Sequence, residues 1–181
     1  PSIDDLQVIT LMRDSIAPDN KITTVLSKRG NRKDTVKLRL ANTYMVKVLM
    51  NNYNIYPRKT YDKTFRFPTM DKQFRRHFIR GYMDGDGSFG NRHFSMICNS
   101  VLFLGDILSE FKNAIPDLKH YVYEENRSLT TYYSLHFSVN KKSRLDLFNY
   151  LYKDCQYRLD RKFNKAWNTV LNSKSKELLS V

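Results

Sequence analysis

The apolar residues of the chain follow two periods, which predicts a mixture of helices and strands. Spacings of three and four residues predict short helices within 2–21 and 100–119, and strict alternation predicts strands at Val36–Leu40 and Tyr133–Phe137. Further helices are predicted after each strand, at Tyr44–Tyr53 and Ser143–Tyr152. A helix, a strand and a second helix therefore occur twice in the same order.

These two stretches also match in part residue by residue, which indicates an internal repeat. Leu6 falls on Leu104, Ile9 on Ile107 and Lys21 on Lys119, 98 positions apart, and the two strands match 97 positions apart. Chance similarity is the alternative, but four elements in the same order argue against it. We therefore predict a truncated first half-repeat at 1–68 and a complete second half-repeat at 69–181.

The most informative segment is 78–89, which reads Phe-Ile-Arg-Gly-Tyr-Met-Asp-Gly-Asp-Gly-Ser-Phe. An apolar helix is predicted to end there in two carboxylates, Asp84 and Asp86. Gly81 and Gly85 lie four residues apart, so they share one helix face and allow another helix to approach closely. Gly87 is expected to end the helix in the left-handed conformation. Such a close helix pair would place a metal ligand in the middle of an interface.

Two other interpretations apply to the same segment. A polar turn after a helix is one, because Asp and Gly are common in turns. A calcium loop beginning at Asp84 is the other, but it needs Gly at its sixth position and Glu at its twelfth, where this chain has Phe89 and Ser95. The calcium loop is therefore excluded.

Composition limits the kind of binding partner and the cellular compartment that this protein can have. The chain has 181 residues, enough for one domain or two small halves, and a net charge of +13 from 31 Lys+Arg and 18 Asp+Glu. This excess indicates a polyanion such as nucleic acid, with a merely soluble basic protein as the alternative. Cys98 and Cys155 form no disulfide framework or zinc spacing. The sequence shows no apolar run of membrane-spanning length and no signal peptide, so we expect no membrane partner. We also expect an intracellular protein, located in the cytoplasm, the nucleoid or an organelle matrix, and not a secreted one.

The segment from Ile79 to Gly87 resembles the signature of the LAGLIDADG homing endonucleases. Asp84 and Asp86 stand at its two acids and Gly81 at its first glycine, whereas Arg80 and Tyr82 depart from it and are expected off the close-packed face. The flanking Lys59-Thr60, Phe67-Pro68 and Arg161-Lys162-Phe-Asn-Lys also resemble phage and intein-type members. The likeness covers nearly the whole chain, but the repeat places no counterpart of Asp86 in the first half. The missing motif is expected on an N-terminal fragment or a partner chain, unless the protein works without it.

The resemblance implies an α/β (α+β) fold in which two pseudo-twofold αββαββα halves meet along their motif helices. The antiparallel sheets of the two halves would form a basic saddle over double-stranded DNA. The last acid of the motif would bind a divalent metal, normally Mg²⁺, at the scissile phosphate. For this chain, the implied activity is site-specific DNA cleavage by phosphodiester hydrolysis.

Five residues are the candidates for this chemistry. Asp86 is the expected metal ligand, since a hard cation prefers carboxylate oxygen, and the carbonyl of Gly85 or of Gly87 can add a second ligand. Lys59 and Lys162 occupy matching places and can polarise water or stabilise developing charge, although phosphate contact is the simpler role for any lysine here. Asn99 would orient water or cap a helix. Asp84 is equally open to a structural role.

The polar faces of the strands and their loops supply the DNA-binding candidates. These are Lys28, Arg29, Arg32, Lys33, Lys37, Arg39, Arg92, His93, Ser134 and His136. Solvated surface is the alternative for any one of them. Two further functions stay open beside cleavage: a catalytically inactive, sequence-specific DNA-binding regulator, and an RNA-binding maturase that assists intron splicing.

Overall fold

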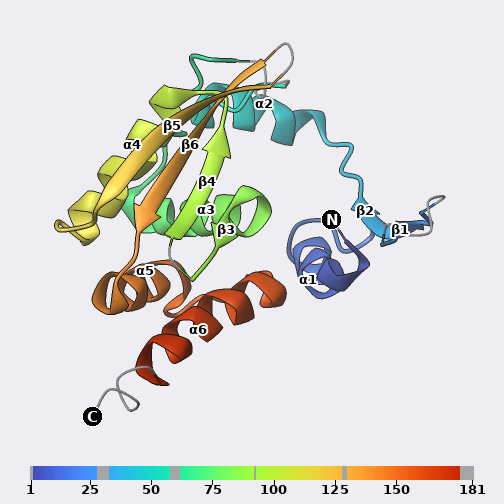
Figure 1. Ribbon diagram of the computed structural model, residues 1–181. Helices are drawn as coiled ribbons and strands as arrows, with labels where there is room; N and C mark the ends of the chain where they lie inside the picture. Colours follow the sequence, from blue (N-terminus) through green and yellow to red (C-terminus); the bar gives the residue numbers. More distant parts are fainter. Residues whose placement is uncertain (1, 28–32, 58–61, 92, 128–129, 176–181) are drawn as a thin grey trace.

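The computed structural model describes residues 2–27, 33–57, 62–91, 93–127 and 130–175. Within these residues it contains six α-helices and two antiparallel sheets, so the predicted mixture of helices and antiparallel strands is confirmed (Figure 1). The larger sheet and four of the helices belong to the second half of the chain, and the smaller sheet belongs to the first half.

The second half alternates helices with strand pairs. Its elements are α3 (Lys72–Asp86), β3 (Ser88–Phe89), β4 (His93–Cys98), α4 (Val101–Ala114), β5 (His120–Arg127), β6 (Thr130–Ser138), α5 (Lys141–Tyr152) and α6 (Asp160–Ser175). The sheet order is β3-β4-β6-β5, and every neighbouring pair is antiparallel. The strand β6 therefore lies in the interior of the sheet and β5 at an edge.

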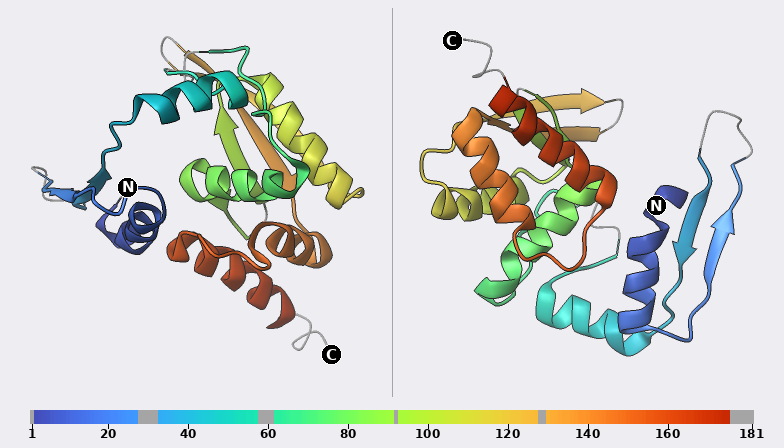
Figure 2. Two further views of the ribbon diagram at one scale, coloured as in Figure 1. Left: turned by 180° about the vertical axis from the view of Figure 1, so that it is seen from behind. Right: turned by 90° about the horizontal axis from the view of Figure 1, so that it is seen from below.

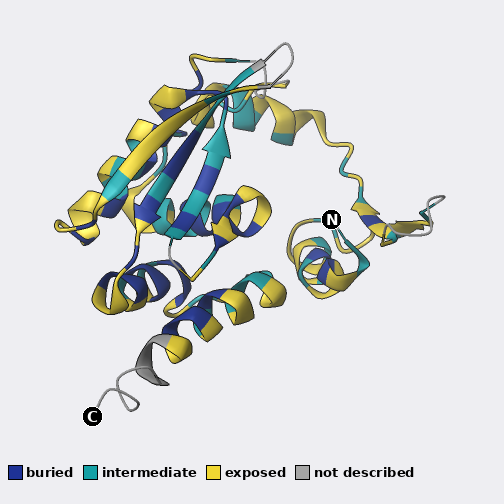
Figure 3. Ribbon diagram, in the orientation of Figure 1, coloured by how far each residue is buried: buried dark blue, intermediate teal, exposed yellow. Residues whose placement is uncertain are grey.

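The main hydrophobic core lies on one face of this sheet. Phe94 and Met96 of β4 flank Ser95, Leu135 and Phe137 of β6 flank His136, and all four apolar residues are buried. Figure 3 shows buried stretches along the strands of this sheet and on the helices that cover it. They belong to one cluster with buried side chains of α3, α4, α5 and α6, and the rings of Phe111 and Phe137 lie 4.8 Å apart. Because side chains of a strand alternate between faces, the intervening residues lie on the opposite face, which we call the open face because Tyr121 and Tyr123 of β5 are exposed on it.

The first half is smaller and poorly buried. It comprises η1 (Ile3–Asp5), α1 (Leu6–Ile16), the β1–β2 pair (Ile22–Val25 and Thr35–Leu38) and α2 (Thr43–Tyr53). Among its described residues up to 57, only Ile9 and Val36 are buried apolar residues, and α2 has no buried residue. Its start lies beside the beginning of α6 (Figures 1 and 2), where Asp5 pairs with Arg161 and Ser15 hydrogen-bonds to Tyr157.

Local hydrogen bonds repeat between the two halves. Asn42 and Asn140, 98 positions apart, each cap the helix that follows by accepting from the backbone N–H three residues on, at 2.9 Å. At the ends of α1 and α4, Ala17 donates to Arg13 and Ile115 donates to Phe111 in the same way. The hydrogen bond that begins α2 therefore recurs at the start of α5, and the hydrogen bond that ends α1 recurs at the end of α4.

The strand pairing corrects the match that the sequence suggested. Ile22 pairs with Leu38, and its counterpart His120 pairs with Phe137, so the second strands match 99 rather than 97 positions apart. Val36 therefore corresponds to Leu135, and both are 0% exposed. A slip of two residues leaves every side chain on the same face, so alternation alone could not distinguish the two matches.

Candidate functional site

The glycine face of α3 is open in this chain. Gly81 and Gly85 are exposed, and a Cβ atom built on either one meets no heavy atom within 4 Å. A hollow of about 630 Å³ runs along this face, between α3 and the ends of β4 and β6. The close helix contact expected at these glycines is therefore not made by any described residue of the chain itself.

The side chain of Tyr82 lies on this face too. It lines the hollow, and its hydroxyl donates to the carbonyl of Ile97 at 2.7 Å. The expectation that Tyr82 lies off the glycine face is therefore wrong. A helical residue adjacent to Gly81 lies only about 100° around the helix, so a ring as large as tyrosine still reaches the same groove.

The helix does not end in a left-handed glycine. Gly87 has φ −80° and ψ 161°, which is extended backbone, and no described glycine has a positive φ. Its N–H donates to the Met83 carbonyl at 3.0 Å, and the chain passes directly into β3. A Cβ at this position would lie 2.5 Å from the same carbonyl oxygen, so close approach, rather than backbone conformation, demands glycine here.

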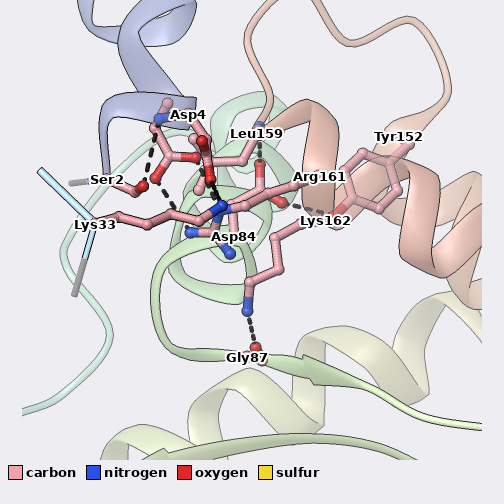
Figure 4. Close-up of polar contacts among 10 residues, drawn as sticks. Ser2, Asp4, Lys33, Asp84, Gly87, Tyr152, Leu159, Arg161 and Lys162 are labelled. Carbon is pink, nitrogen blue, oxygen red and sulfur yellow. Dashed lines mark hydrogen bonds and ion pairs between the residues drawn. The ribbon is translucent and has the colours of Figure 1, made fainter. Parts of the chain in front are cut away.

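Asp84 is a structural residue. Its carboxylate is buried and accepts hydrogen bonds from the Tyr152 hydroxyl at 2.6 Å and from the Leu159 N–H at 2.9 Å (Figure 4). Burial raises the pKa of Asp84, and these two hydrogen bonds oppose the rise. The interaction fixes the segment before α6 to the end of α3.

Asp86 has a different environment only two residues later. It is the last residue of α3, it is exposed, and it lines the hollow. Within the described part of the chain, no residue hydrogen-bonds to its carboxylate or pairs with it. The negative end of the helix dipole lies at the same place, so both charges favour a cation.

Lys162 of α6 reaches the same end of the helix. Its ammonium group donates to the Gly87 carbonyl (Figure 4). Burial lowers the pKa of Lys162, repulsion by Arg161 and Lys165 adds to this, and attraction by Asp84 and Asp86 opposes it. The Gly87 carbonyl is therefore already engaged.

Asn99 is the third candidate that the fold brings to this place. It follows β4 directly, is buried, and lines the hollow together with Gly85 and Asp86. The structure thus gathers Asp86, Gly85 and Asn99 at one hollow, with Lys162 on the backbone next to it. Lys59 lies outside the described residues.

The DNA-binding candidates occupy several surfaces. Lys28, Arg29, Arg32 and Arg92 lie outside the described residues. Lys33 pairs with Asp4, whereas Lys37 of β2 and Arg39 directly after it are exposed.

The remaining candidates lie on the open face of the larger sheet. His93, Ser134 and His136 alternate with the core residues of β4 and β6. The Ser134 hydroxyl is buried and donates to Glu125 at 2.9 Å. Of these three, His93 and His136 are therefore the better placed for external contact.

The sequence alone did not identify several residues that are important to this region. Tyr121 and Tyr123 of β5 share the open face of the sheet with His136, and their spacing of two residues was a signal for a strand face. Tyr152 and Leu159 hold Asp84, but they lie 68 and 75 positions from it, and no local pattern indicates such a pairing.

The donor groups at the hollow suit only some metals. Among the described residues, no group of three or more His, Cys, Asp or Glu side chains could hold a metal ion. Zinc, which needs about four protein or water ligands of fixed geometry, is poorly matched. Magnesium keeps several waters and binds through one or two carboxylates together with substrate phosphates, so a single exposed aspartate at a helix end is compatible with it.

No protein-family model and no curated protein matches this chain. Among the described helices, none has both the length and the apolar character needed to cross a membrane.

Proposed function

We propose that this protein is a site-specific double-stranded DNA endonuclease of the LAGLIDADG type that hydrolyses phosphodiester bonds with Mg²⁺ or another divalent cation. The observation that supports it most is the contrast within α3. Asp84 is buried and satisfied by Tyr152 and Leu159, while Asp86 is exposed at the rim of a hollow with no described protein partner. Asp84 stabilises the fold, and Asp86 remains available to bind a ligand.

Each residue then has a defined task. Asp86 and the Gly85 carbonyl hold the cation, which supplies charge neutralisation at the phosphate. Lys162, fixed on the Gly87 carbonyl, keeps a positive charge close to the phosphate and stabilises the negative charge that develops there. Asn99 orients a water molecule in the hollow.

Duplex DNA is the proposed substrate because the chain carries a net charge of +13. Lys37 of β2 and Arg39 directly after it are exposed and contribute contacts. Lysine and arginine contacts to phosphate make binding fall steeply with salt, and this dependence is the expected signature.

A second polypeptide segment is proposed to complete the site. Gly81 and Gly85 face open space, and α2 buries none of its residues. A helix with small residues of its own fits the glycine face and brings a second carboxylate next to Asp86. A further segment of the protein or a partner chain can supply it, and sedimentation or light scattering of the active species distinguishes a single chain from an assembly.

The test is cleavage of long duplex DNA in Mg²⁺ by the protein together with the segment that completes the site, with EDTA as the metal-free reference. Asp86→Asn should abolish cleavage and leave salt-sensitive DNA binding intact. Asp71→Asn is the matched control, because Asp71 lies at the other end of α3, is exposed and makes no capping hydrogen bond through its side chain. Equal cleavage by wild type and Asp86→Asn would exclude the proposed role of Asp86.

One observation also favours a binding protein without cleavage. The described residues bring a single exposed carboxylate to the hollow, and no cluster of three potential ligands. A regulator of this kind would bind a specific duplex with the same affinity in wild type and Asp86→Asn, and would cut nothing even with the missing helix supplied. The maturase alternative would instead prefer a folded intron to duplex DNA.

A further inference from the structure

Four aromatic rings form a continuous cluster on the open face of the larger sheet. Tyr121 stacks on His136, with ring centroids 5.1 Å apart and an angle of 13° between the planes. Tyr123 meets both rings edge to face, at 5.0 and 5.2 Å, and His93 contacts His136 at 5.2 Å. Three strands, β4, β6 and β5, therefore contribute to one aromatic surface.

This surface is available to a ligand. Tyr121 is 37% exposed and Tyr123 is 55% exposed, whereas the aromatic residues on the other face of the sheet, such as Phe94 and Phe137, are fully buried. No core requirement explains two exposed tyrosines that lie two residues apart on an edge strand. Their rings are already held by contacts with His136, so little side-chain freedom remains to be lost on binding.

The chemistry of the cluster favours a flat, weakly polar partner. His136 is packed among rings, its Nδ1 atom is buried without a hydrogen-bond partner among the described residues, and burial together with the nearby His93 lowers its pKa. The carboxylate of Glu125, on the neighbouring strand, accepts a hydrogen bond from the Ser134 hydroxyl on the same face. At neutral pH the His136 ring is therefore uncharged, and it offers a flat aromatic face between the two tyrosines.

We propose that this cluster, centred on Tyr121, Tyr123 and His136, is a stacking site for unpaired nucleobases of a single-stranded nucleic acid. A base has a flat face that matches an exposed tyrosine ring, and such stacking is largely independent of sequence. Lys119, which is exposed, directly precedes β5 and has its carbonyl hydrogen-bonded to the Ser138 N–H, supplies a cation for the adjoining phosphate. The net charge of +13 favours the backbone of such a strand.

Duplex DNA is the less suitable ligand for these rings. A paired duplex presents base edges in its grooves and keeps its base faces covered by neighbouring pairs. Unpaired bases occur in RNA loops and ends and in single-stranded DNA, and both present the same flat faces. The proposal does not depend on cleavage, because no residue of the cluster lines the hollow next to Asp86.

Binding of fluorescent 12-nucleotide single strands tests the proposal. The probes are an RNA and a DNA of the same mixed sequence and the corresponding DNA duplex, all measured in EDTA so that no cleavage occurs. The variants are Tyr121→Leu and Tyr123→Leu, alone and together, and Tyr123→Phe, which keeps the ring. Tyr44→Leu is the matched control, because Tyr44 is 78% exposed on α2, away from the sheet.

The expected result is a loss of single-strand affinity of about tenfold for each ring removed. Tyr123→Phe and Tyr44→Leu should bind as wild type, and duplex binding should change little. Tighter binding of the RNA would identify RNA as the natural source of the unpaired bases, and equal or tighter binding of the DNA would identify single-stranded DNA. Unchanged single-strand affinity in the double leucine variant, or an equal loss for the duplex, would overturn the proposal. Circular dichroism shows whether each variant keeps its fold.

Discussion

The open glycine face of α3 can be tested without knowing any ligand. Gly81 lies in the middle of a 15-residue helix, and a Cβ there meets nothing within 4 Å. Glycine in a helix interior is less stable than alanine by about 0.8–1 kcal/mol, chiefly because it loses more backbone freedom on folding. Gly81→Ala should therefore raise the free energy of unfolding by about 1 kcal/mol, which corresponds to about 2–4 °C in Tm for a chain of this size.

Two other glycines serve as internal references. Gly105 lies inside α4, and a Cβ there also meets nothing within 4 Å, so Gly105→Ala should give the same gain at a place unrelated to the hollow. Gly87→Ala should have the opposite sign, because its Cβ would lie 2.5 Å from the Met83 carbonyl oxygen and 2.8 Å from the Met83 sulfur. We expect that change to destabilise the protein by about 1–3 kcal/mol.

Urea unfolding, followed by far-UV circular dichroism at two protein concentrations, measures all three variants. If Gly81→Ala lost stability while Gly105→Ala gained it, something must pack on the glycine face in solution. A loss that depended on protein concentration would identify a second copy of the chain. Either result would refute the conclusion that this face is open in the isolated chain.

Three further predictions concern the contacts around the site and the sheet. Arg161→Ala should lower the free energy of unfolding by about 1–3 kcal/mol in the same urea assay, because it leaves the buried Asp5 carboxylate without its charged partner. Tyr152→Phe should cost about 1.5–3 kcal/mol, because the Asp84 carboxylate then keeps only one of its two hydrogen bonds. Burial lowers the pKa of His136 below its usual 6.5 in the folded protein, so the unfolded chain is protonated first as the pH falls. The free energy of unfolding should therefore decrease from about pH 7 downward and become constant once the pH is below the lowered pKa. His136→Gln should flatten this part of the stability profile, measured by urea unfolding between about pH 8 and pH 5.

The sequence was informative where the signal was local. The periods of the apolar residues predicted helices and strands that the structure contains, including α3 with two carboxylates in its last turn. The repeat was also visible, since helix caps such as Asn42 and Asn140 depend on residues three positions away. These features follow from interactions within one turn or one strand, which neighbouring residue types control.

The sequence was less informative about what each acid does. Asp84 and Asp86 are two positions apart and of the same residue type, so no local pattern separates them. Their difference arises because Asp84 points to Tyr152 and Leu159, which the fold brings from far along the chain, while Asp86 points away. In the same way, alternation predicted the faces of the strands, but only the pairing of β1 with β2 fixed the register.

By itself, then, the sequence determined the element types, the matching helix caps of the two halves, the basic charge and the acidic end of α3. These depend on residue identity and on spacings of two to four positions. The tertiary structure alone decided that Asp84 is buried and satisfied, that Asp86 is available, that Lys162 reaches Gly87, and that Tyr121 and Tyr123 join His136 on an open sheet face. The physical reason is that burial and hydrogen-bond partners come from segments distant in sequence, and only the packing of those segments determines which polar groups are satisfied within the chain and which remain free to bind a ligand.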